Sequence, residues 1–239
     1  MNDWLDRTEL LLGEEALARL KKKNILVAGL GGVGAYAAEM LCRTGIGNMT
    51  IIDADTIHSS NINRQLPALH STVGEYKAKL LGDRFRDINP EIKLNCLTEF
   101  LKDELITTLL DGNSFDFIID AIDTISPKVY LLYHAISKKI PVVSAMGAAG
   151  KMDITKICIT DISQTYQCSL AKTIRKRLRD LGINKNLPVV FSPEIVKKDS
   201  LILLDNEPNK RSSAGTISYL PATFGCYLAY YAIQQLINK

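Results

Sequence analysis

The chain has 239 residues, of which 46% are hydrophobic, and a formal net charge of +3. This length and composition suit one large α/β domain, and they exclude a small scaffold that depends on disulfides or metal ions for its core. The charge is unevenly divided, because residues 1–150 carry 16 Lys and Arg against 19 Asp and Glu, whereas residues 151–239 carry 13 against 7. A basic half joined to an acidic half favours a polyanionic partner, with a solvated basic surface as the alternative.

The N-terminal residues lack the apolar segment of a signal peptide, and no apolar run approaches the roughly 20 residues of a membrane span. The five cysteines form no CxxC pair, which argues against a four-cysteine zinc site and favours reduced thiols. We therefore expect a cytoplasmic protein that has no membrane association and no structural zinc.

Predicted strands and helices alternate over residues 1–150. Helices at 3–11 and 14–22 precede a strand at 24–29, a helix at 32–44 and a strand at 49–53. A polar loop at 54–73 leads to a helix at 76–88, a strand at 93–97, a helix at 102–110, a strand at 115–122, a helix at 127–138 and a strand at 141–145. Short apolar runs that alternate with amphipathic helices predict a mostly parallel sheet with right-handed crossovers.

The pattern changes after Gly150. Residues 154–159 alternate like an antiparallel strand, 169–181 form a basic amphipathic helix, 182–217 are polar and irregular, and 223–237 form an apolar closing helix. We predict one α/β domain over 1–239, Rossmann-like, in which antiparallel strands continue a mostly parallel sheet with flanking helices. Its first part, 1–150, would bind a nucleotide, and its basic part, 151–239, would bind substrate and form a dimer.

A glycine-rich turn joins the first predicted strand to the following helix. Gly29, Gly31, Gly32 and Gly34 occupy this turn, where glycines allow a tight bend and close approach of the backbone to phosphate. The N-terminus of the helix then offers unpaired N–H groups to phosphate oxygens. Asp53 ends the second strand, where a carboxylate accepts hydrogen bonds from ribose hydroxyls. The turn predicts a nucleotide site, and the usual ligand of this pattern is NAD.

Several motifs make the chain similar to the ThiF/MoeB/HesA (E1-like) superfamily. Asp53-Ala-Asp55 is followed by Ser60-Asn61-Ile62-Asn63-Arg64-Gln65, Lys77 follows 13 residues after Arg64, and Asp120-Ala-Ile-Asp123 closes a later strand. The branch that the chain resembles most is that of the tRNA threonylcarbamoyladenosine dehydratases. The segments that indicate this branch are RTELLLGEEAL, RTGIGNMTIID, NINRQLPAL, IDAIDTISPK and FSPE.

The resemblance favours ATP over NAD, and the chemistry of the residues agrees. Arg64 and Lys77 would bring two cations to the triphosphate, and Asp123 would hold Mg²⁺ near the α-phosphate. Each residue alone has a simpler interpretation, as a surface charge for Arg64 and Lys77 or as a helix N-cap for Asp123. The predicted nucleotide-binding residues are Gly29, Gly31, Gly32, Gly34, Asp53, Asp55, Ser60, Asn61, Arg64, Lys77 and Asp123.

The resemblance also implies an activity and a quaternary structure. It implies a homodimer in which Arg7 reaches the partner's site, so that the predicted catalytic residues are Arg7, Arg64, Lys77 and Asp123. The implied reaction is the ATP-dependent, AMP-forming cyclisation of N6-threonylcarbamoyladenosine in tRNA, with a sulfur-transfer accessory protein as a further implied partner. The alternative in the same superfamily is adenylation of the C-terminus of a ubiquitin-like sulfur carrier, and a NAD-dependent dehydrogenase is a more distant one.

Two features of the chain bear on these alternatives. Superfamily members that activate sulfur carriers usually have two CxxC pairs for zinc, and this chain has none. Cys158 falls within a predicted strand and is expected in the core, which leaves Cys168 as the candidate nucleophile of that region. Cyclisation of an acyl-adenylate needs no cysteine, which favours the dehydratase interpretation.

The predicted helix at 169–181 has an apolar stripe and a cationic remainder. Leu170, Ile174, Leu178 and Leu181 would face the protein. Cations along a surface attract phosphate backbones with little base specificity, so we expect this helix to bind tRNA. A solvated helix face is the alternative. The predicted RNA-binding residues are Lys172, Arg175, Lys176, Arg177 and Arg179.

Overall fold

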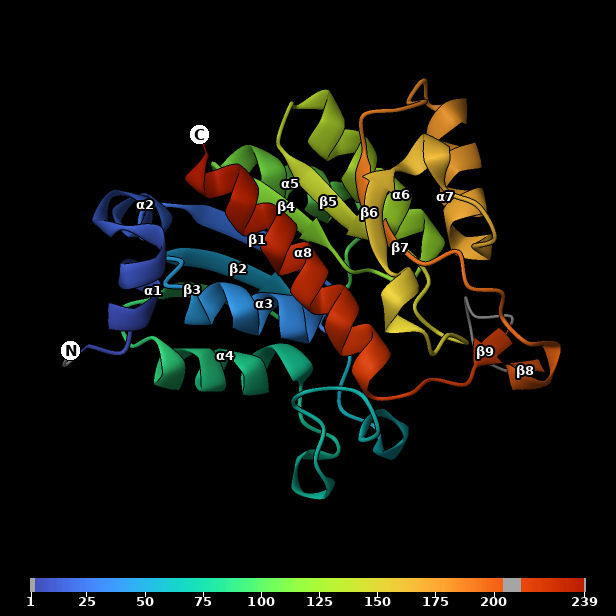
Figure 1. Cartoon of the computed structure of the whole chain (residues 1–239), viewed down its shortest axis with the longest axis horizontal. Helices are drawn as coiled ribbons and strands as arrows, with labels where there is room; N and C mark the ends of the chain where they lie inside the picture. Colours follow the sequence, from blue (N-terminus) through green and yellow to red (C-terminus); the bar gives the residue numbers. More distant parts are fainter. Residues whose placement is uncertain (1–2, 204–211, 239) are drawn as a thin grey trace.

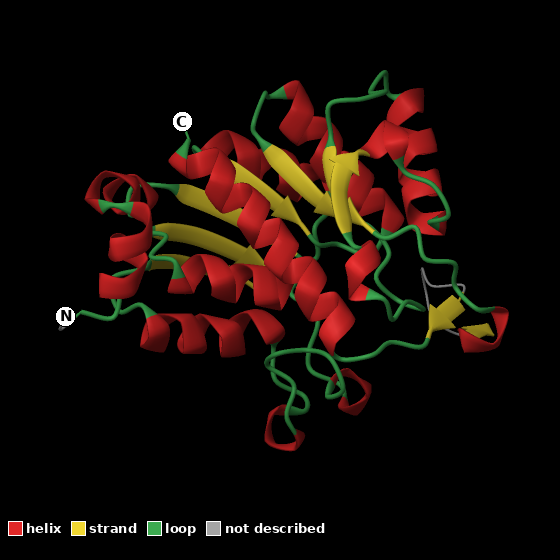
Figure 2. Ribbon diagram, viewed as in Figure 1, coloured by secondary structure: helices red, strands yellow, loops and turns green. Residues whose placement is uncertain are grey.

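A computed structural model describes residues 3–203 and 212–238 and consists of a twisted sheet with helices on both faces (Figures 1 and 2). Seven strands form the main sheet in the order β3-β2-β1-β4-β5-β7-β6, and all neighbours are parallel except β6 and β7. The strands are β1 (Asn24–Ala28), β2 (Asn48–Ile52), β3 (Lys93–Leu97), β4 (Phe117–Asp120), β5 (Val142–Ala145), β6 (Cys158–Asp161) and β7 (Pro188–Phe191). The predicted mostly parallel α/β fold, continued by an antiparallel strand, is confirmed.

Eight α-helices surround the sheet in the described part of the chain. They are α1 (Asp6–Leu12), α2 (Glu14–Leu20), α3 (Gly34–Arg43), α4 (Lys77–Ile88), α5 (Asp103–Gly112), α6 (Ile125–Ser137), α7 (Ser169–Asp180) and α8 (Tyr219–Ile237). Alternate residues of each strand point to opposite faces of the sheet. Ile25 and Val27 of β1 accordingly pack in the core under α3, α4 and α8, whereas Leu26 packs in a second core under α5, α6 and α7. Burial on both faces explains why β1, β4 and β5 are mainly apolar, whereas β3 and β6 at the edges of the sheet are partly exposed.

The close packing of α8 on α3 depends on a glycine. A Cβ at Gly225 would lie 2.4 Å from the carbonyl oxygen of Val33, so no other residue fits there without a shift of one helix. Figure 1 shows α8 crossing the sheet beside α3. This packing brings the first turn of α8 to the glycine-rich turn, where a Cβ at Gly32 would lie 3.2 Å from Cβ of Pro221. The C-terminal helix therefore borders the predicted nucleotide site.

The predictions after residue 150 were wrong in three places. Residues 154–156 form a 3₁₀ turn rather than a strand, because the Asp153 side chain accepts a hydrogen bond from Thr155 N, and the strand runs from Cys158 to Asp161. Residues 188–191, expected to be irregular, form β7 within the main sheet. The closing helix begins at Tyr219 rather than at 223, since its first turn tolerates Pro221.

Smaller elements complete the described chain. Strands β8 (Leu201–Leu203) and β9 (Ser212–Ala214) form an antiparallel pair, and residues 204–211 of the predicted irregular segment lie outside the described residues. Short 3₁₀ turns occur at Ser59–Asn61, His70–Thr72, Ile154–Lys156, Ile162–Gln164 and Lys198–Ser200. None of the described helices combines the length and the hydropathy needed to cross a membrane.

Candidate nucleotide site

The turn between β1 and α3 requires glycine at two positions. Gly29 has a φ of +86°, and a Cβ there would lie 2.7 Å from the carbonyl oxygen of Ala121, just beyond β4. A Cβ at Gly34 would lie 1.8 Å from the carbonyl oxygen of Gly29. These contacts hold the turn against the carboxyl end of β4, at the edge where parallel sheets bind ligands.

The middle of the turn is open, and a buried amide faces it. A Cβ at Gly31 would have the Gln65 amide nitrogen as its nearest neighbour, at 3.8 Å. Gln65 is only 8% exposed, and its Oε1 is the one buried side-chain oxygen in the described residues that has no hydrogen-bond partner. An unsatisfied buried acceptor costs about 1–3 kcal/mol, so this atom fits a ligand that donates a hydrogen bond. Gln65 belongs to the motif at 60–65, and its role was not predicted.

Asp53 fixes the backbone around the turn. One carboxylate oxygen accepts a hydrogen bond from Leu30 N at 2.6 Å, and the other accepts one from Asp55 N at 2.8 Å. Burial raises the pKa of Asp53 above its ordinary value, against the opposing charge of Lys77. Because a carboxylate oxygen accepts more than one hydrogen bond, the predicted contact with ribose hydroxyls is compatible with both backbone contacts.

Lys77, the first residue of α4, is directed inward. Lys77 is 4% exposed. Its Nζ lies 2.8 Å from Oδ2 of Asp55, whose side chain is 68% exposed. The interpretation of Lys77 as an ordinary surface charge is therefore wrong. A buried ammonium needs a negative partner, and a phosphate could take the place of the exposed Asp55 carboxylate. The predicted residues Asp55 and Lys77 thus act as a pair in this structure.

The loop between β2 and α4 brings Arg64 to the same edge. The guanidinium donates to the backbone oxygen of Ser60 at 2.8 Å and to Oδ1 of Asn63 at 2.9 Å. Burial lowers the pKa of Arg64, and the negative charge of Asp123 opposes this shift. Arg64 and Asp123 therefore lie near each other, although they belong to different segments.

Two further predicted residues support this loop. Asn61 is buried, and its Oδ1 accepts a hydrogen bond from His58 N at 3.0 Å, so that only the NH₂ end of its amide can donate to a phosphate. The backbone oxygen of Arg64 would lie 3.2 Å from a Cβ at Gly32. The loop consequently closes over the glycine-rich turn.

Asp123 lies in the exposed turn between β4 and α6. In the part of the chain that the structure describes, no group of three or more His, Cys, Asp or Glu side chains could hold a metal ion. Mg²⁺ commonly binds through one or two carboxylates together with substrate phosphates and water. The donor set at Asp123 fits a Mg²⁺ ion that arrives with a nucleotide, and it does not fit a site made by protein ligands alone.

Comparison with known proteins agrees with this geometry. The ThiF family matches residues 5–239. The chain belongs to the ThiF family. The tRNA threonylcarbamoyladenosine dehydratase of Bacillus subtilis (strain 168) is 37% identical over 239 residues, which cover 97% of this chain and 94% of the relative.

Two solved structures of a ThiF-family relative are similar over the whole chain. The E. coli tRNA N6-threonylcarbamoyladenosine dehydratase TcdA in complex with ATP has a TM-score of 0.89 and 34% identity, with 100% of this chain and 96% of that chain covered. The same protein in complex with AMP has a TM-score of 0.88, also with 34% identity, over 100% of this chain and 97% of that chain. The expected E1-like fold is therefore confirmed.

Arg7 does not reach the site of its own chain in this ThiF-family fold. The side chain of Leu5 would contact a Cβ at Gly45, 3.1 Å away, so α1 begins near the C-terminal end of α3. The glycine-rich turn lies at the other end of this ten-residue helix, which is about 15 Å long. Arg7 is exposed, and α1 buries none of its residues.

The basic helix α7 begins at the nucleotide-binding edge and runs away from it. Cys168, its N-cap, has its sulfur 3.6 Å from a Cβ built at Gly147, just beyond β5. Lys172, Lys176, Arg177 and Arg179 are exposed. Arg175 instead donates to the backbone oxygen of Thr165 at 2.9 Å and so ties α7 to the preceding loop. Leu181, expected in the apolar stripe, is 41% exposed, and Ala171 is buried in its place.

The burial of the two cysteines near this region is the reverse of what was expected. Cys158 is exposed rather than in the core, because it begins a strand at the outer edge of the sheet. Cys168 is buried at 8% exposure. A buried thiol in this position is a poor candidate for a nucleophile that must meet a substrate.

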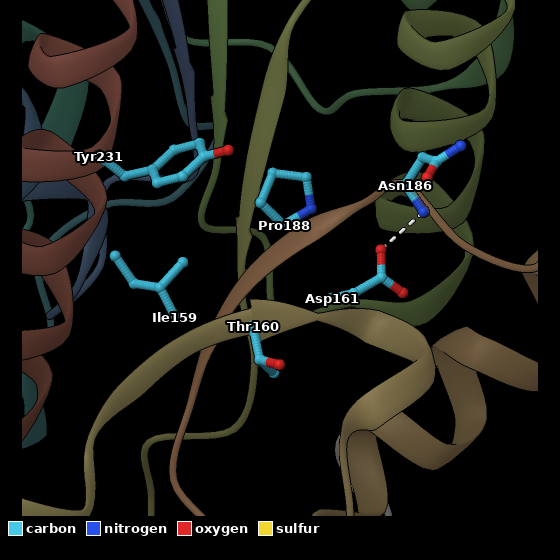
Figure 3. Close-up of a pocket in the computed structure, with 6 residues that line it drawn as sticks. All are labelled: Ile159, Thr160, Asp161, Asn186, Pro188 and Tyr231. Carbon is cyan, nitrogen blue, oxygen red and sulfur yellow. Dashed lines mark hydrogen bonds between the residues drawn. The ribbon is translucent and has the colours of Figure 1, made fainter.

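The hollow in Figure 3 is separate from the nucleotide site. It has a volume of about 390 Å³ and lies where β7 begins and β6 ends, at the opposite edge of the sheet. Its polar contacts include the hydrogen bond from Asn186 N to Asp161, at 2.6 Å. No predicted site residue lines it. The lining residues are Ile159, Thr160, Asp161, Asn186, Pro188 and Tyr231.

Proposed function

We propose that this chain uses ATP to activate the carboxylate of N6-threonylcarbamoyladenosine in tRNA and then closes a ring with net loss of one water. The observation that carries the proposal is the open glycine-rich turn, over which the loop that carries Arg64 closes, beside the buried ammonium of Lys77. The similarity to dehydratases over nearly the whole length of both chains supports the substrate.

The first step would be attack of the substrate carboxylate on the α-phosphate of ATP. The bond between the α-phosphate and the bridging oxygen breaks, and pyrophosphate leaves with the electron pair. Arg64 and Lys77 stabilise the negative charge that builds on the leaving phosphates. The backbone N–H groups at the start of α3 hold the phosphates, and Asp53 orients the ribose.

The second step would be attack on the acyl carbon by the carbamoyl group of the same nucleoside. AMP leaves with the electrons of the acyl–oxygen bond, and the carbamoyl group loses a proton. The enzyme contributes mainly orientation, and an oriented intramolecular attack can supply about 7–11 kcal/mol of the barrier. On this mechanism the chain is an AMP-forming enzyme of the ligase class. The similar structure with AMP supports a site that accepts this product.

Asp123 would hold Mg²⁺ together with the phosphates of the nucleotide. The ion would neutralise charge on the α-phosphate. Asp123 lies in the segment between β4 and α6, whereas the glycine-rich turn and Lys77 lie at the ends of secondary structure elements.

The proposal includes a homodimer in which Arg7 acts in the partner's site. Arg7, Leu10 and Leu11 share one face of α1, since residues three and four apart are neighbours on a helix. Leu10 and Leu11 are each 82% exposed. An exposed arginine beside two exposed leucines favours contact of α1 with another surface.

The proposed surface for tRNA is the exposed face of α7. Lys172, Lys176 and Arg179 follow one another at helical spacing and form a cationic row that leads away from the nucleotide-binding edge. An RNA backbone along this row would present one nucleoside to the edge of the sheet. ATP and tRNA are both found in the cytoplasm, which is the compartment that we propose.

Incubation with ATP, Mg²⁺ and tRNA that contains threonylcarbamoyladenosine tests this function. We expect AMP to form in proportion to a modified nucleoside that is lighter by the mass of one water. Reactions without ATP, or with NAD in its place, serve as controls. AMP formation with a sulfur-carrier protein and none with tRNA would overturn the proposed substrate.

A further inference from the structure

A fully buried ion pair lies beneath the turn that carries Asp123. Nζ of Lys128, in the first turns of α6, lies 2.7 Å from Oδ2 of Asp120, the last residue of β4, and both side chains have no exposed surface. Removing two charges from water is costly, and a pair of apolar residues often fills such a space without loss of stability. The position of the pair therefore calls for an explanation besides stability.

The two side chains hold the same backbone residue from both sides. Asp120 Oδ1 accepts a hydrogen bond from Ile122 N at 3.1 Å, and Lys128 Nζ donates to Ile122 O at 3.0 Å. The hydroxyl of Ser144 in β5 donates to Asp120 Oδ2 at 2.6 Å and fixes the carboxylate. Because Ile122 O belongs to the peptide bond that leads into Asp123, the pair sets the direction in which Asp123 leaves the turn.

The same turn is tied to the glycine-rich turn. Ala121 N donates to Ala28 O at 2.8 Å, and the Ala121 carbonyl is the group that excludes a side chain at Gly29. Each peptide between β4 and Asp123 is thus held by a contact, from Ala28, Asp120 or Lys128. Holding Ile122 by both its N–H and its carbonyl oxygen takes one acceptor and one donor, and an apolar pair supplies neither.

We propose that Asp120 and Lys128 are positioning residues, which hold the Asp123 carboxylate at the edge where the nucleotide phosphates would bind. This inference rests on the proposed function for the role of Asp123. It goes beyond that function because neither residue touches the substrate in the proposed mechanism. A misplacement of about 1 Å in an active site can lower a rate on the order of 100-fold.

The test compares two charge-free double variants. Asp120→Asn with Lys128→Met removes the buried pair while it preserves side-chain size. Lys23→Met with Asp116→Asn removes a second pair, whose Nζ and Oδ1 atoms are 2.9 Å apart where β1 begins, at the opposite edge of the sheet. We expect both double variants to fold. Only the first should need about tenfold more Mg²⁺ for half-maximal AMP formation and show a kcat lowered about 10-fold to 100-fold.

Two measurements do not depend on turnover. Calorimetry should show that the first double variant binds ATP normally without Mg²⁺ but loses most of the gain in affinity that Mg²⁺ gives the parent. Hydrogen exchange of the amides at 121–124 should accelerate. A folded double variant that keeps the parental gain in ATP affinity from Mg²⁺ and the parental exchange rates at 121–124 would overturn the inference. Neither measurement needs activity on tRNA, so a parent that is inactive on tRNA would contradict the proposed function alone.

Milder variants decide the case if the double variant fails to fold. Ser144→Ala releases one bond to Asp120 and leaves the ion pair, whereas Lys128→Arg keeps the charge but displaces the donor from Ile122 O. We expect both to shift the Mg²⁺ requirement in the same direction by smaller amounts. Parental Mg²⁺ dependence in both folded variants would contradict the positioning role.

Discussion

Gln65 links the sequence motif at 60–65 to the glycine-rich turn. Its amide is buried beside Gly31, and its Oε1 lacks a partner in the described residues. A protein that keeps an unsatisfied acceptor in this position loses stability unless a ligand donates to it. The side chain is therefore better explained by nucleotide binding than by folding.

The change Gln65→Met separates these two explanations. Methionine has a similar size but no acceptor that needs a strong donor, so we expect an equal or higher melting temperature for the variant. Affinity for ATP should fall about tenfold, which corresponds to the loss of one hydrogen bond. Thermal melting and calorimetry measure the two quantities, and a variant with reduced stability and parental ATP affinity would contradict the assignment.

That Asp53, Arg64 and Lys77 gather at one turn was predictable, because their spacing belongs to a recurring motif. Asp53, Arg64 and Lys77 lie around the turn that Gly29 and Gly34 shape. The partners of these residues were not predictable. Nothing in the sequence indicates that Lys77 is buried against Asp55, or that Lys128 pairs with Asp120, because both contacts depend on how separate segments meet.

At the scale of the elements, the short strands that depend on their neighbours were the hardest to predict. The four residues of β7 stand between polar segments, and only the pairing with β5 on one side and β6 on the other makes them a strand. In contrast, β1 and β4 were predicted because each is a mainly apolar run that is soon followed by a helix.

Glu39 joins two of these helices. The residue is only 4% exposed. Its carboxylate accepts one hydrogen bond from Arg43 in α3 and two from Arg84 in α4. Burial would raise the pKa of Glu39, but the hydrogen bonds from Arg84 and Arg43 outweigh it and hold the pKa below its ordinary value of 4.5. The ionised form is thus favoured in the folded state.

The change Glu39→Gln should lower stability in a pH-dependent way. Because the folded-state pKa is depressed, the contribution of Glu39 is complete above the unfolded pKa and is lost as the pH falls through the folded pKa. We expect the variant to be less stable by about 1–3 kcal/mol at neutral pH. Denaturant unfolding at several pH values should show the difference shrinking below about pH 4.5. A constant difference, or a comparable one for the exposed Glu15→Gln, would contradict this account.

The exposed face of α7 gives a second prediction for an element. Replacing Lys172, Lys176, Arg177 and Arg179 with serine should weaken tRNA binding, because fewer counterions are released. The log–log dependence of affinity on salt should flatten by roughly 0.7–0.9 for each lost contact. ATP binding should stay unchanged.

A matched control for α7 exists at the opposite edge of the sheet. Replacement of Lys21, Lys22, Lys93 and Lys139 with serine removes the same charge from exposed positions. We expect this variant to keep nearly the parental salt slope. If both quadruple variants bind tRNA equally, the effect belongs to net charge and α7 is only a solvated face.

For the whole molecule, the proposed dimer makes the site composite. Arg7→Ala and Asp123→Ala subunits should each be nearly inactive alone, since loss of one charged group in such a site costs on the order of 10²–10³-fold. Mixed dimers contain one site with both residues intact if Arg7 acts in trans. Part of the activity should therefore return on mixing.

Subunit exchange must be demonstrated for this experiment, for example by two differently tagged chains recovered together. Full exchange without recovered activity would contradict the trans arrangement. A monomer at concentrations where the enzyme is active would contradict the dimer itself.

The central claim is that the chain adenylates a carboxylate before the ring closes. A tRNA substrate whose threonylcarbamoyl carboxylate carries a heavy oxygen isotope tests it most directly, with both products analysed by mass spectrometry. We predict that one labelled oxygen appears in AMP for each cyclised nucleoside and that pyrophosphate carries none, because the carboxylate oxygen attacks the α-phosphate and departs with it. Label in inorganic phosphate or in pyrophosphate, with unlabelled AMP, would contradict the acyl-adenylate and the account built on it.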